Sequence, residues 1–305
     1  MDKPVVTVIC ITCNHAPYVR DALEGIVCQR TDFPMEVIVH DDASTDGTAD
    51  VVRDYAARYP ELIRPVFQEE NQYSRGVQII PEFCFSLVRG RYVALCEGDD
   101  RWTDPSKLQR QVEALERHPE VDICAHCTRR TRNGRTEGFI APQLRDGVIP
   151  VAEAVKVLPL ATASILVRAE NYLKVSPMRE IHFNDYALQL QAAERGGVLY
   201  LSACMAEYRR QTPGSWTATH RGTKRMEARR EERRQLKAFD AWTDGKYHSS
   251  VRWRIRKTRS SDLIARHRYA ALLSPRWLLL MLQRLGRKLL QYIRNFYCML
   301  RWKSM

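Results

Sequence analysis

Three carboxylates surround a single glycine at Glu97-Gly98-Asp99-Asp100, directly after the apolar run Tyr92-Val93-Ala94-Leu95-Cys96. Carboxylates crowded at the end of a buried strand repel one another and lose hydration, so a divalent cation among them stabilises the cluster. Asp99 and Asp100 are the residues placed to hold such a cation against a diphosphate group. The spacing therefore predicts a metal and diphosphate site.

Two further polar clusters follow apolar runs. Thr12-Cys13-Asn14 comes after the run that begins at Val5, and the cluster from Asp41 to Thr48 comes after Glu36-Val37-Ile38-Val39-His40. Helical patterns follow both clusters, and strands that alternate with helices indicate an α/β fold with a mostly parallel sheet. Ligands bind such sheets beyond the carboxyl ends of the strands, so we expect clusters 12–14, 41–46 and 97–100 to line one crevice.

The rest of the pattern predicts further elements and a domain boundary. Strands are expected at 62–67, 91–96, 121–127, 162–168 and 198–203, helices at 83–88, 107–118 and around 186–193, and a hairpin turn at Asn133-Gly134. From about Thr217 the chain changes to charged helices. We expect a domain at 1–216, with a nucleotide-binding part at about 1–104 and an acceptor part at about 105–216, and a basic helical extension at 217–305.

The cysteines favour a reducing compartment. There are nine, an odd number without the spacing of a disulfide framework, and no signal peptide precedes the first apolar run, which predicts a cytoplasmic protein. Two Cys-x-x-Cys pairs, Cys10 with Cys13 and Cys124 with Cys127, invite a zinc site. Strand alternation would send the two sulfurs of each pair to opposite faces, so buried apolar thiols are the favoured interpretation.

Positive charge is concentrated at the end of the chain. The formal net charge is +12, and nine Lys or Arg without any Asp or Glu follow from Leu263 onward. Leucines from Leu278 to Leu300 recur at helical spacing among arginines, and the longest apolar run is too short to cross a bilayer, so we expect interfacial helices on an anionic membrane surface. Packing against the body or a second subunit is the alternative. No recognition-module pattern accompanies the charge, so we expect no nucleic-acid partner.

Together these motifs resemble a known family. Val6 to Asn14, His40 to Thr48 and Glu97-Gly98-Asp99-Asp100 are similar to the amino-terminal half of family 2 glycosyltransferases, which have the GT-A fold. The stretch Gln68 to Gly76, with Leu95 to Leu108, is similar to bacterial members that build surface polysaccharides. The resemblance covers about residues 4–216.

The resemblance implies a role for particular residues. It implies that Asp42 binds the nucleotide base, that Thr12, Asn14 and Arg75 help hold the nucleotide, and that Asp99 with Asp100 holds ribose and a Mg²⁺ or Mn²⁺ ion. Asn184-Asp185-Tyr186 stands where the family carries its acidic base, which makes Asp185 the candidate. Tyr208-Arg209 resembles the dipeptide that precedes a late active-site loop, here Gln211 to Trp216.

Three departures from the family pattern qualify these roles. Cys13 stands where many relatives have an aromatic residue that stacks on the base, and Gln211 stands where a histidine often occurs. The Gln-x-x-Arg-Trp motif of processive relatives is absent, which favours the transfer of one sugar at a time.

The predicted function is that of an inverting, metal-dependent transferase. It would move one sugar from a nucleoside diphosphate sugar to a hydroxyl of a lipid-linked glycan at the inner face of the cell membrane. A sugar nucleotidyltransferase is an alternative, although the expected glycine-rich loop after the first strand is missing. A non-catalytic assembly protein is another alternative, because carboxylates such as Asp42 and Asp185 also favour turns and helix starts, and arginines such as Arg75 are common on solvated surfaces.

Overall fold

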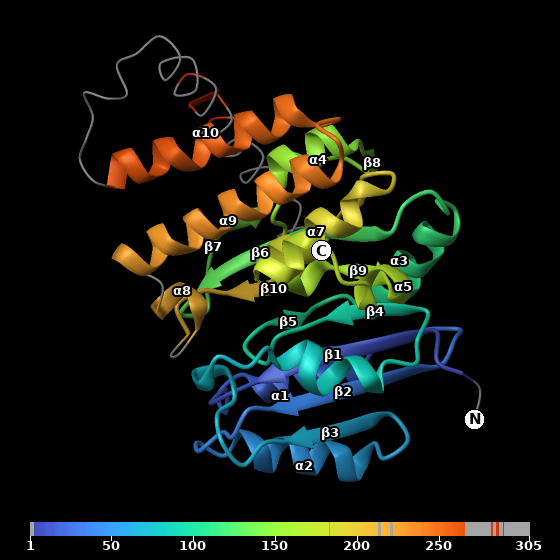
Figure 1. The fold of residues 1–305 in the computed structure, drawn as a ribbon. Coiled ribbons are helices and arrows are strands. Elements are labelled where there is room, and N and C mark those ends of the chain that lie inside the picture. Colours follow the sequence, from blue (N-terminus) through green and yellow to red (C-terminus); the bar gives the residue numbers. More distant parts are fainter. Residues whose placement is uncertain are drawn as a thin grey trace.

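The computed structural model describes residues 3–182, 184–212, 215–219 and 222–265, together with residues 282, 285, 286 and 289. A 10-stranded sheet runs through this part of the chain in the order β3-β2-β1-β4-β9-β6-β10-β5, with β7 paired to β6 and β8 paired to β10. Figure 1 shows the first strands at one end of the molecule and the last described helices at the other.

The amino-terminal half is a parallel α/β unit. Its strands are β1 (Val6–Thr12), β2 (Met35–Asp41), β3 (Ile63–Phe67) and β4 (Tyr92–Leu95), and its helices are α1 (Val19–Val27) and α2 (Thr48–Arg58). β1 pairs in parallel with both β2 and β4, and β2 pairs in parallel with β3. The predicted alternation of strands and helices is confirmed here.

The second half of the sheet mixes directions. β6 (Ile123–Arg132) and β10 (Val198–Arg209) are parallel, whereas β9 (Leu166–Arg168) runs antiparallel between β4 and β6. Three short strands complete the sheet, each antiparallel to its neighbour: β5 (Arg101–Trp102), β7 (Arg135–Ile140) and β8 (Gly147–Ile149). The expected hairpin turn at Asn133-Gly134 joins β6 to β7.

Helices cover both faces of the sheet, and alternation along the strands divides the core. On one face Ile9 and Ile38 pack with residues of α7, and on the other Val8 and Val37 pack with residues of α1 and α3. The helices of this half are α3 (Lys107–Glu116), α4 (Val151–Val157), α5 (Ala169–Leu173), α6 (Pro177–Ile181) and α7 (Asp185–Glu194). Cys124 and Cys127 enter opposite clusters, which confirms the expectation of buried thiols.

Two long helices form the end of the described chain. After α8 (Trp216–Thr219), helix α9 (Gly222–Trp242) packs on α6, and α10 (His248–Ala265) packs on α9 and α4. Leu236, Phe239 and Val251 are fully or almost fully buried in the same core cluster as the sheet. The amphipathic pattern from Leu278 onward lies mostly outside the described residues, although Leu282, Leu285 and Leu289 are described and exposed. None of the described helices has the length and apolar character needed to cross a bilayer.

Two predicted elements differ in detail. Residues 83–88 were expected to form one helix, but the structure has a π-helical turn at Ile80–Cys84 followed by a 3-10 turn at Phe85–Leu87. The expected strand 162–168 begins with a 3-10 turn at Thr162–Ser164, and only Leu166–Arg168 joins the sheet. Proline at position 81 lacks the N–H of a regular helix, and β9 is short because it bridges two parallel strands for only part of their length.

Candidate nucleotide and metal site

The carboxyl ends of β1, β2 and β4 meet at one edge of the sheet, as the sequence predicts. Thr12 is in register with Asp41, and the N–H of Asp42 donates to the carbonyl of Thr12 at 2.9 Å. The N–H of Gly98 donates to the carbonyl of Ile11 at 2.8 Å. The three polar clusters are therefore brought together by main-chain hydrogen bonds rather than by side chains alone.

Gly98 sits in close contact with the loop after β1. A Cβ atom added at Gly98 would lie 2.6 Å from the Thr12 Oγ1 atom and 2.9 Å from the His15 Nδ1 atom. Neither of these two buried polar atoms has a hydrogen-bond partner within the described residues. A glycine is needed here because the acidic turn passes directly over two side chains that remain available to a ligand.

Asp99 and Asp100 are buried at this edge, with 5% and 0% of their surface exposed. Asp100 Oδ1 accepts from the N–H of Arg209 at 3.0 Å, but Asp100 Oδ2 has no partner among the described residues. Burial, with the nearby carboxylates of Asp99 and Glu97, raises the pKa of Asp100 well above its ordinary value. A buried carboxylate oxygen without a partner is costly for the protein alone, and a bound cation would remove that cost.

The late strand β10 and the segment after it hold the acidic turn from the opposite side. Thr212 Oγ1 donates to Asp99 Oδ2 at 2.6 Å, and Arg209 Nη1 donates to the carbonyl of Asp99 at 3.3 Å. Arg209 also pairs with Asp21 of α1 at 2.5 Å. The predicted late loop therefore begins in direct contact with the predicted metal ligands.

Few protein ligands are available for a metal ion. Among the described residues, no group of three or more His, Cys, Asp or Glu side chains is arranged to hold one. Asp99 and Asp100 alone supply carboxylate oxygens. Such a pair fits Mg²⁺ or Mn²⁺ shared with a bound diphosphate, because these ions are commonly held by one or two carboxylates together with substrate phosphates and water.

Asn14 is a structural residue of the β1 loop. It adopts a φ of 53°, its N–H donates to Ser44 Oγ at 2.8 Å, and its Oδ1 accepts from the N–H of Thr45 at 2.8 Å. The next N–H, of His15, donates to Thr48 Oγ1 at 2.8 Å. These bonds join the loops after β1 and β2, so Asn14 organises the predicted site without pointing its amide oxygen at a ligand.

Asp42 and Arg75 both have protein partners. Asp42 Oδ1 accepts from the N–H of Gln72 at 2.8 Å, and Asp42 Oδ2 accepts from the N–H of Tyr73 at 3.0 Å. Arg75 is largely exposed and pairs with Glu70. The carboxylate of Asp42 thus fixes the segment that carries Arg75, a contact that cannot be predicted from the sequence pattern.

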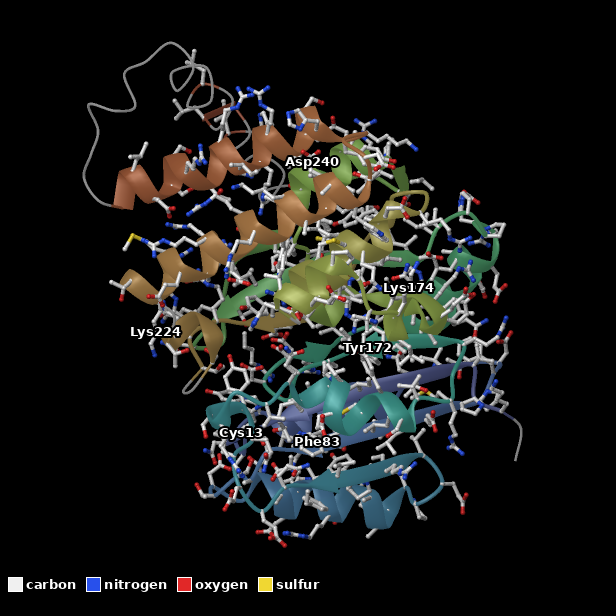
Figure 2. The ribbon with its side chains drawn as sticks, in the orientation of Figure 1. Cys13, Phe83, Tyr172, Lys174, Lys224 and Asp240 are labelled. Atoms are coloured by element: carbon white, nitrogen blue, oxygen red, sulfur yellow. The ribbon has the colours of Figure 1, made fainter. Side chains whose placement is uncertain are left out.

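Cys13 lies beside the same segment. Asn71 Nδ2 donates to Cys13 Sγ at 3.2 Å and to the carbonyl of Asp42 at 3.3 Å. Figure 2 shows Cys13 among the loops at the sheet edge and Phe83 on the neighbouring helical turn. Phe83 stacks on His40 with ring centroids 5.3 Å apart. The Phe83 ring therefore packs against β2 and does not take the place of the aromatic residue that many relatives have at position 13.

Asp185 begins α7, with its carboxylate toward the acidic turn. Thr162 Oγ1 donates to Asp185 Oδ2, and Asn184 caps the helix by accepting from the N–H of Ala187 at 2.9 Å. Burial raises the pKa of Asp185, and burial together with the charges of Asp185 and Asp99 raises the pKa of Glu97 well above its ordinary value. The charge of Asp185 contributes to the raised pKa of Glu97, so these two carboxylates belong to the same buried region.

A buried lysine packs against the strand that follows the acidic turn. Lys107 Nζ donates to Gln111 Oε1 at 2.7 Å and lies 4.0 Å from the ring centroid of Trp102. Burial lowers the pKa of Lys107 to about 7, although the nearby thiols of Cys96 and Cys124 act in the opposite direction. The lysine packs on the ring of Trp102. Trp102 in turn pairs with Ala206, so that β5 joins β10 shortly before Arg209.

Sequence reasoning missed several contributors to this site. His15 immediately follows the predicted cluster 12–14, and its buried Nδ1 atom lies close to Gly98, so its position was a usable signal. Glu97 was recognised in the acidic motif but was given no separate role. Thr212 lies in the predicted late loop Gln211 to Trp216 but was given no role of its own, and Asp21 lies in no motif; both contact the site because β10 returns to the acidic turn.

The chain is similar to known proteins over its amino-terminal two thirds. Residues 7–143 match the family described as Glycosyl transferase family 2. Uncharacterized proteins of Mycobacterium bovis and Mycobacterium tuberculosis are 37% identical over 215 residues, which cover 70% of this chain and 61% of theirs. The Bacillus subtilis protein TuaG, whose name assigns it to teichuronic acid biosynthesis, is 28% identical over 210 residues, which cover 68% of this chain and 79% of TuaG.

Solved structures show the same fold. Residues 1–349 of S. aureus TarS in complex with UDP-GlcNAc align with a TM-score of 0.65 and 18% identity, covering 89% of this chain and 78% of that one. The mannosyltransferase PcManGT from Pyrobaculum calidifontis, in complex with GDP-Man and Mn²⁺, aligns with a TM-score of 0.54 and 20% identity, covering 98% and 84%. The fold is the GT-A fold. The chain spans about three fifths of the length of the mycobacterial relatives that it matches.

Proposed function

We propose that the chain, whose residues 7–143 match glycosyl transferase family 2, transfers a single sugar from a nucleoside diphosphate sugar to a hydroxyl of a growing surface polysaccharide. The donor class is supported by the UDP-GlcNAc and GDP-Man complexes of the two structural relatives. The polysaccharide is supported by the name of TuaG. Transfer of one sugar at a time is supported by the absence of a Gln-x-x-Arg-Trp motif.

One observation carries the proposal. Asp100 Oδ2 is buried and lacks a partner within the described residues, at an edge where Thr12 Oγ1 and His15 Nδ1 also lack partners. Thr12 Oγ1 and His15 Nδ1 lie so close to Gly98 that a side chain there would collide with both. A folded protein retains buried polar atoms without partners where a ligand regularly binds them. A metal-bound diphosphate would supply positive charge for Asp100 Oδ2 and acceptor oxygens for the other two atoms.

We assign Mg²⁺ or Mn²⁺ to Asp99 and Asp100, supported by the Mn²⁺ in the PcManGT complex. The ion supplies positive charge for the diphosphate that leaves the sugar. The chain's own residues orient this pair: Arg209 N–H holds Asp100, and Thr212 holds Asp99. Asp42, Thr12 and Arg75 remain the proposed nucleotide contacts, with Asn14 shaping the loop that presents them.

We assign the role of general base to Asp185. An acceptor hydroxyl must lose its proton as it attacks the sugar, and a carboxylate within hydrogen-bond reach can accept it. Thr162 orients the Asp185 carboxylate, and its raised pKa makes it a stronger base than a solvated aspartate. Proton transfer to Asp185 on the face opposite the departing diphosphate gives a single displacement, which inverts the anomeric configuration.

A panel of sugar nucleotides tests this function. Each would be added with Mn²⁺, and the melting temperature would be recorded, because a ligand that binds only the folded state raises it. One donor should stand out and should be consumed when an acceptor glycan is present. Release of diphosphate from a nucleoside triphosphate would instead identify a nucleotidyltransferase, and stabilisation by none of the donors would leave only a non-catalytic role.

We further propose that the acceptor is lipid-linked and that the protein works at the inner face of the cell membrane. Support comes from the nine Lys or Arg, without Asp or Glu, from Leu263 onward. Truncation after Ser274 should release the protein from anionic vesicles in a sedimentation assay. Equal sedimentation of the truncated and full chains would refute membrane binding by this segment, and self-association of the full chain alone would favour its role as a subunit contact.

A further inference from the structure

Several arginines gather around Glu137 on the ladder formed by β10, β6 and β7. Figure 1 shows the end of this ladder near α8. We call this cluster the arginine hollow. The cluster borders a surface cavity of about 580 Å³, which is lined by Arg132, Asn133, Arg135 and Glu137. The cluster consists of Arg130, Arg132, Arg135, Arg210 and Glu137.

The arginine hollow has more positive charge than its one carboxylate can balance. Arg210 Nη1 lies 2.9 Å from Glu137 Oε2, Arg130 Nε lies 3.8 Å from the same oxygen, and Arg132 pairs with the other oxygen. Arg135 has no ion-pair partner among the described residues. Three guanidinium groups therefore share one carboxylate, and the fourth has no carboxylate of its own in the described chain.

Two of the guanidinium groups, those of Arg130 and Arg210, are held in place by their surroundings, whereas Arg132 and Arg135 are exposed beside them. The side chains of Arg130 and Arg210 are 31% and 28% exposed, so each keeps only part of its hydration. Burial and the charges of Arg210 and Arg132 lower the pKa of Arg130 against the opposing effect of Glu137. Clustered, partly dehydrated guanidiniums have the geometry and charge that bind phosphate oxygens in pairs.

β10 links the arginine hollow to the candidate site. Arg209 N–H donates to Asp100, and the next residue, Arg210, pairs with Glu137 while its N–H donates to the carbonyl of Thr131 at 2.9 Å. Side chains of successive strand residues point to opposite sides. A ligand that reaches both places therefore passes the end of β10.

We propose that the arginine hollow binds a phosphate group of the acceptor, because Arg210 follows directly on Arg209, which holds Asp100 of the candidate site. The assignment of that phosphate to an acceptor rests on the proposed function, whereas phosphate binding itself does not. The phosphate could belong to the diphosphate of a lipid carrier or to a phosphodiester polymer. Both present the same group to Arg132, Arg135 and Arg210.

Binding of inorganic diphosphate, measured by calorimetry with a chelator and without donor, tests the site. Arg132→Gln and Arg210→Gln should each weaken binding about tenfold, because each removes a charge-assisted contact. Glu137→Gln should strengthen binding, which loss of structure would not do. Arg58→Gln is the matched control, because Arg58 is an exposed arginine paired with Asp54 on α2.

The result that overturns the proposal is equal binding by Arg58→Gln, Arg132→Gln and Arg210→Gln. Arg135→Gln keeps the test decisive if a paired arginine proves necessary for folding, since Arg135 is exposed and supports no ion pair in the described chain. Repetition in an Asp100→Asn background separates this site from the donor site. Binding that survives there would uphold the hollow as a site apart from the donor site. Absence of sugar transfer by the unsubstituted protein with every donor of the panel would reject the proposed function alone.

Two further arms identify the source of the phosphate. Neutral vesicles that carry a polyprenyl diphosphate are compared with a soluble polyglycerol phosphate. If Arg132→Gln binds one of these two ligands more weakly than Arg58→Gln does, that ligand represents the acceptor class. Loss in neither arm would overturn the assignment of the hollow to an acceptor.

Discussion

The main-chain N–H of Arg209 donates to Asp100 Oδ1 at 3.0 Å, across 109 positions of sequence. The end of the last long strand thereby fixes one oxygen of the acidic turn and leaves the other without a partner in the described chain. The orientation of the proposed metal ligand thus depends on the correct position of β10. Changes at either end of this contact should be visible in both activity and stability.

Asp100→Asn should abolish most activity without unfolding the protein. Asparagine keeps an oxygen for the Arg209 N–H but removes the charge that a cation needs, so kcat/KM should fall about 100- to 1,000-fold, as for other preorganised electrostatic groups. Without ligand, the melting temperature should be equal or higher, because crowding with Asp99 and Glu97 is relieved. Calorimetry with Mn²⁺ and the best nucleotide checks the binding, with Asp50→Asn on the exposed face of α2 as the control.

Asp185→Asn should separate chemistry from donor binding. Loss of a general base lowers kcat by about 100- to 10,000-fold, while stabilisation by donor and Mn²⁺ should be unchanged. Thr162→Val keeps the carboxylate and removes only its hydroxyl partner, so its effect should be smaller. Retention of wild-type kcat by Asp185→Asn would exclude the assignment.

Gly98→Ala should destabilise the protein and weaken nucleotide binding. The new Cβ would lie 2.6 Å from Thr12 Oγ1 and 2.7 Å from Thr12 Cβ, so the acidic turn or the β1 loop must move. Overpacking of this kind costs about 1–3 kcal/mol, measurable by urea denaturation. A Cβ at Gly286 meets nothing within 4 Å, and Gly286→Ala should show neither effect.

Lys107 should make stability rise with pH. Its pKa falls from 10.5 to about 7 on folding, so between these values the unfolded chain binds more protons than the folded one. The free energy of unfolding should therefore increase from pH 7 toward pH 10.5 and change little through this group below pH 7. The free energy of unfolding of Lys107→Met, measured by urea denaturation, should lack this increase between pH 7 and pH 10.5. The same pH dependence in the variant and the unsubstituted protein would contradict a neutral buried amine.

Sequence reasoning found the strand ends because each combines an apolar run with an adjacent polar cluster. Asp41, Asp99 and Thr12 all come to the same edge, which the parallel arrangement required. The partners of Asp42 could not be inferred, because a pattern identifies a carboxylate but not which N–H groups a later loop brings to it. The contact of Thr212 with Asp99 could not be inferred for the same reason, although the loop that carries Thr212 was predicted, since the contact depends on the long return of β10.

Short elements were missed for a different physical reason. β5 has two residues and β8 has three, so neither is long enough to show an alternating pattern. Helices α5 and α6 have five residues each, less than two turns, and gain their stability from packing rather than from local sequence. The longer helices α3 and α7 were predicted because their apolar residues repeat over several turns.

The two hydrogen bonds that Asp42 accepts from Gln72 and Tyr73 have a consequence for how a nucleotide would enter. They tie the segment leading to Arg75 to the end of β2, so that segment is already ordered before any ligand arrives. A nucleotide should then bind to a preorganised segment, with little loop closure. Solvent viscosity should therefore slow association only through its effect on diffusion.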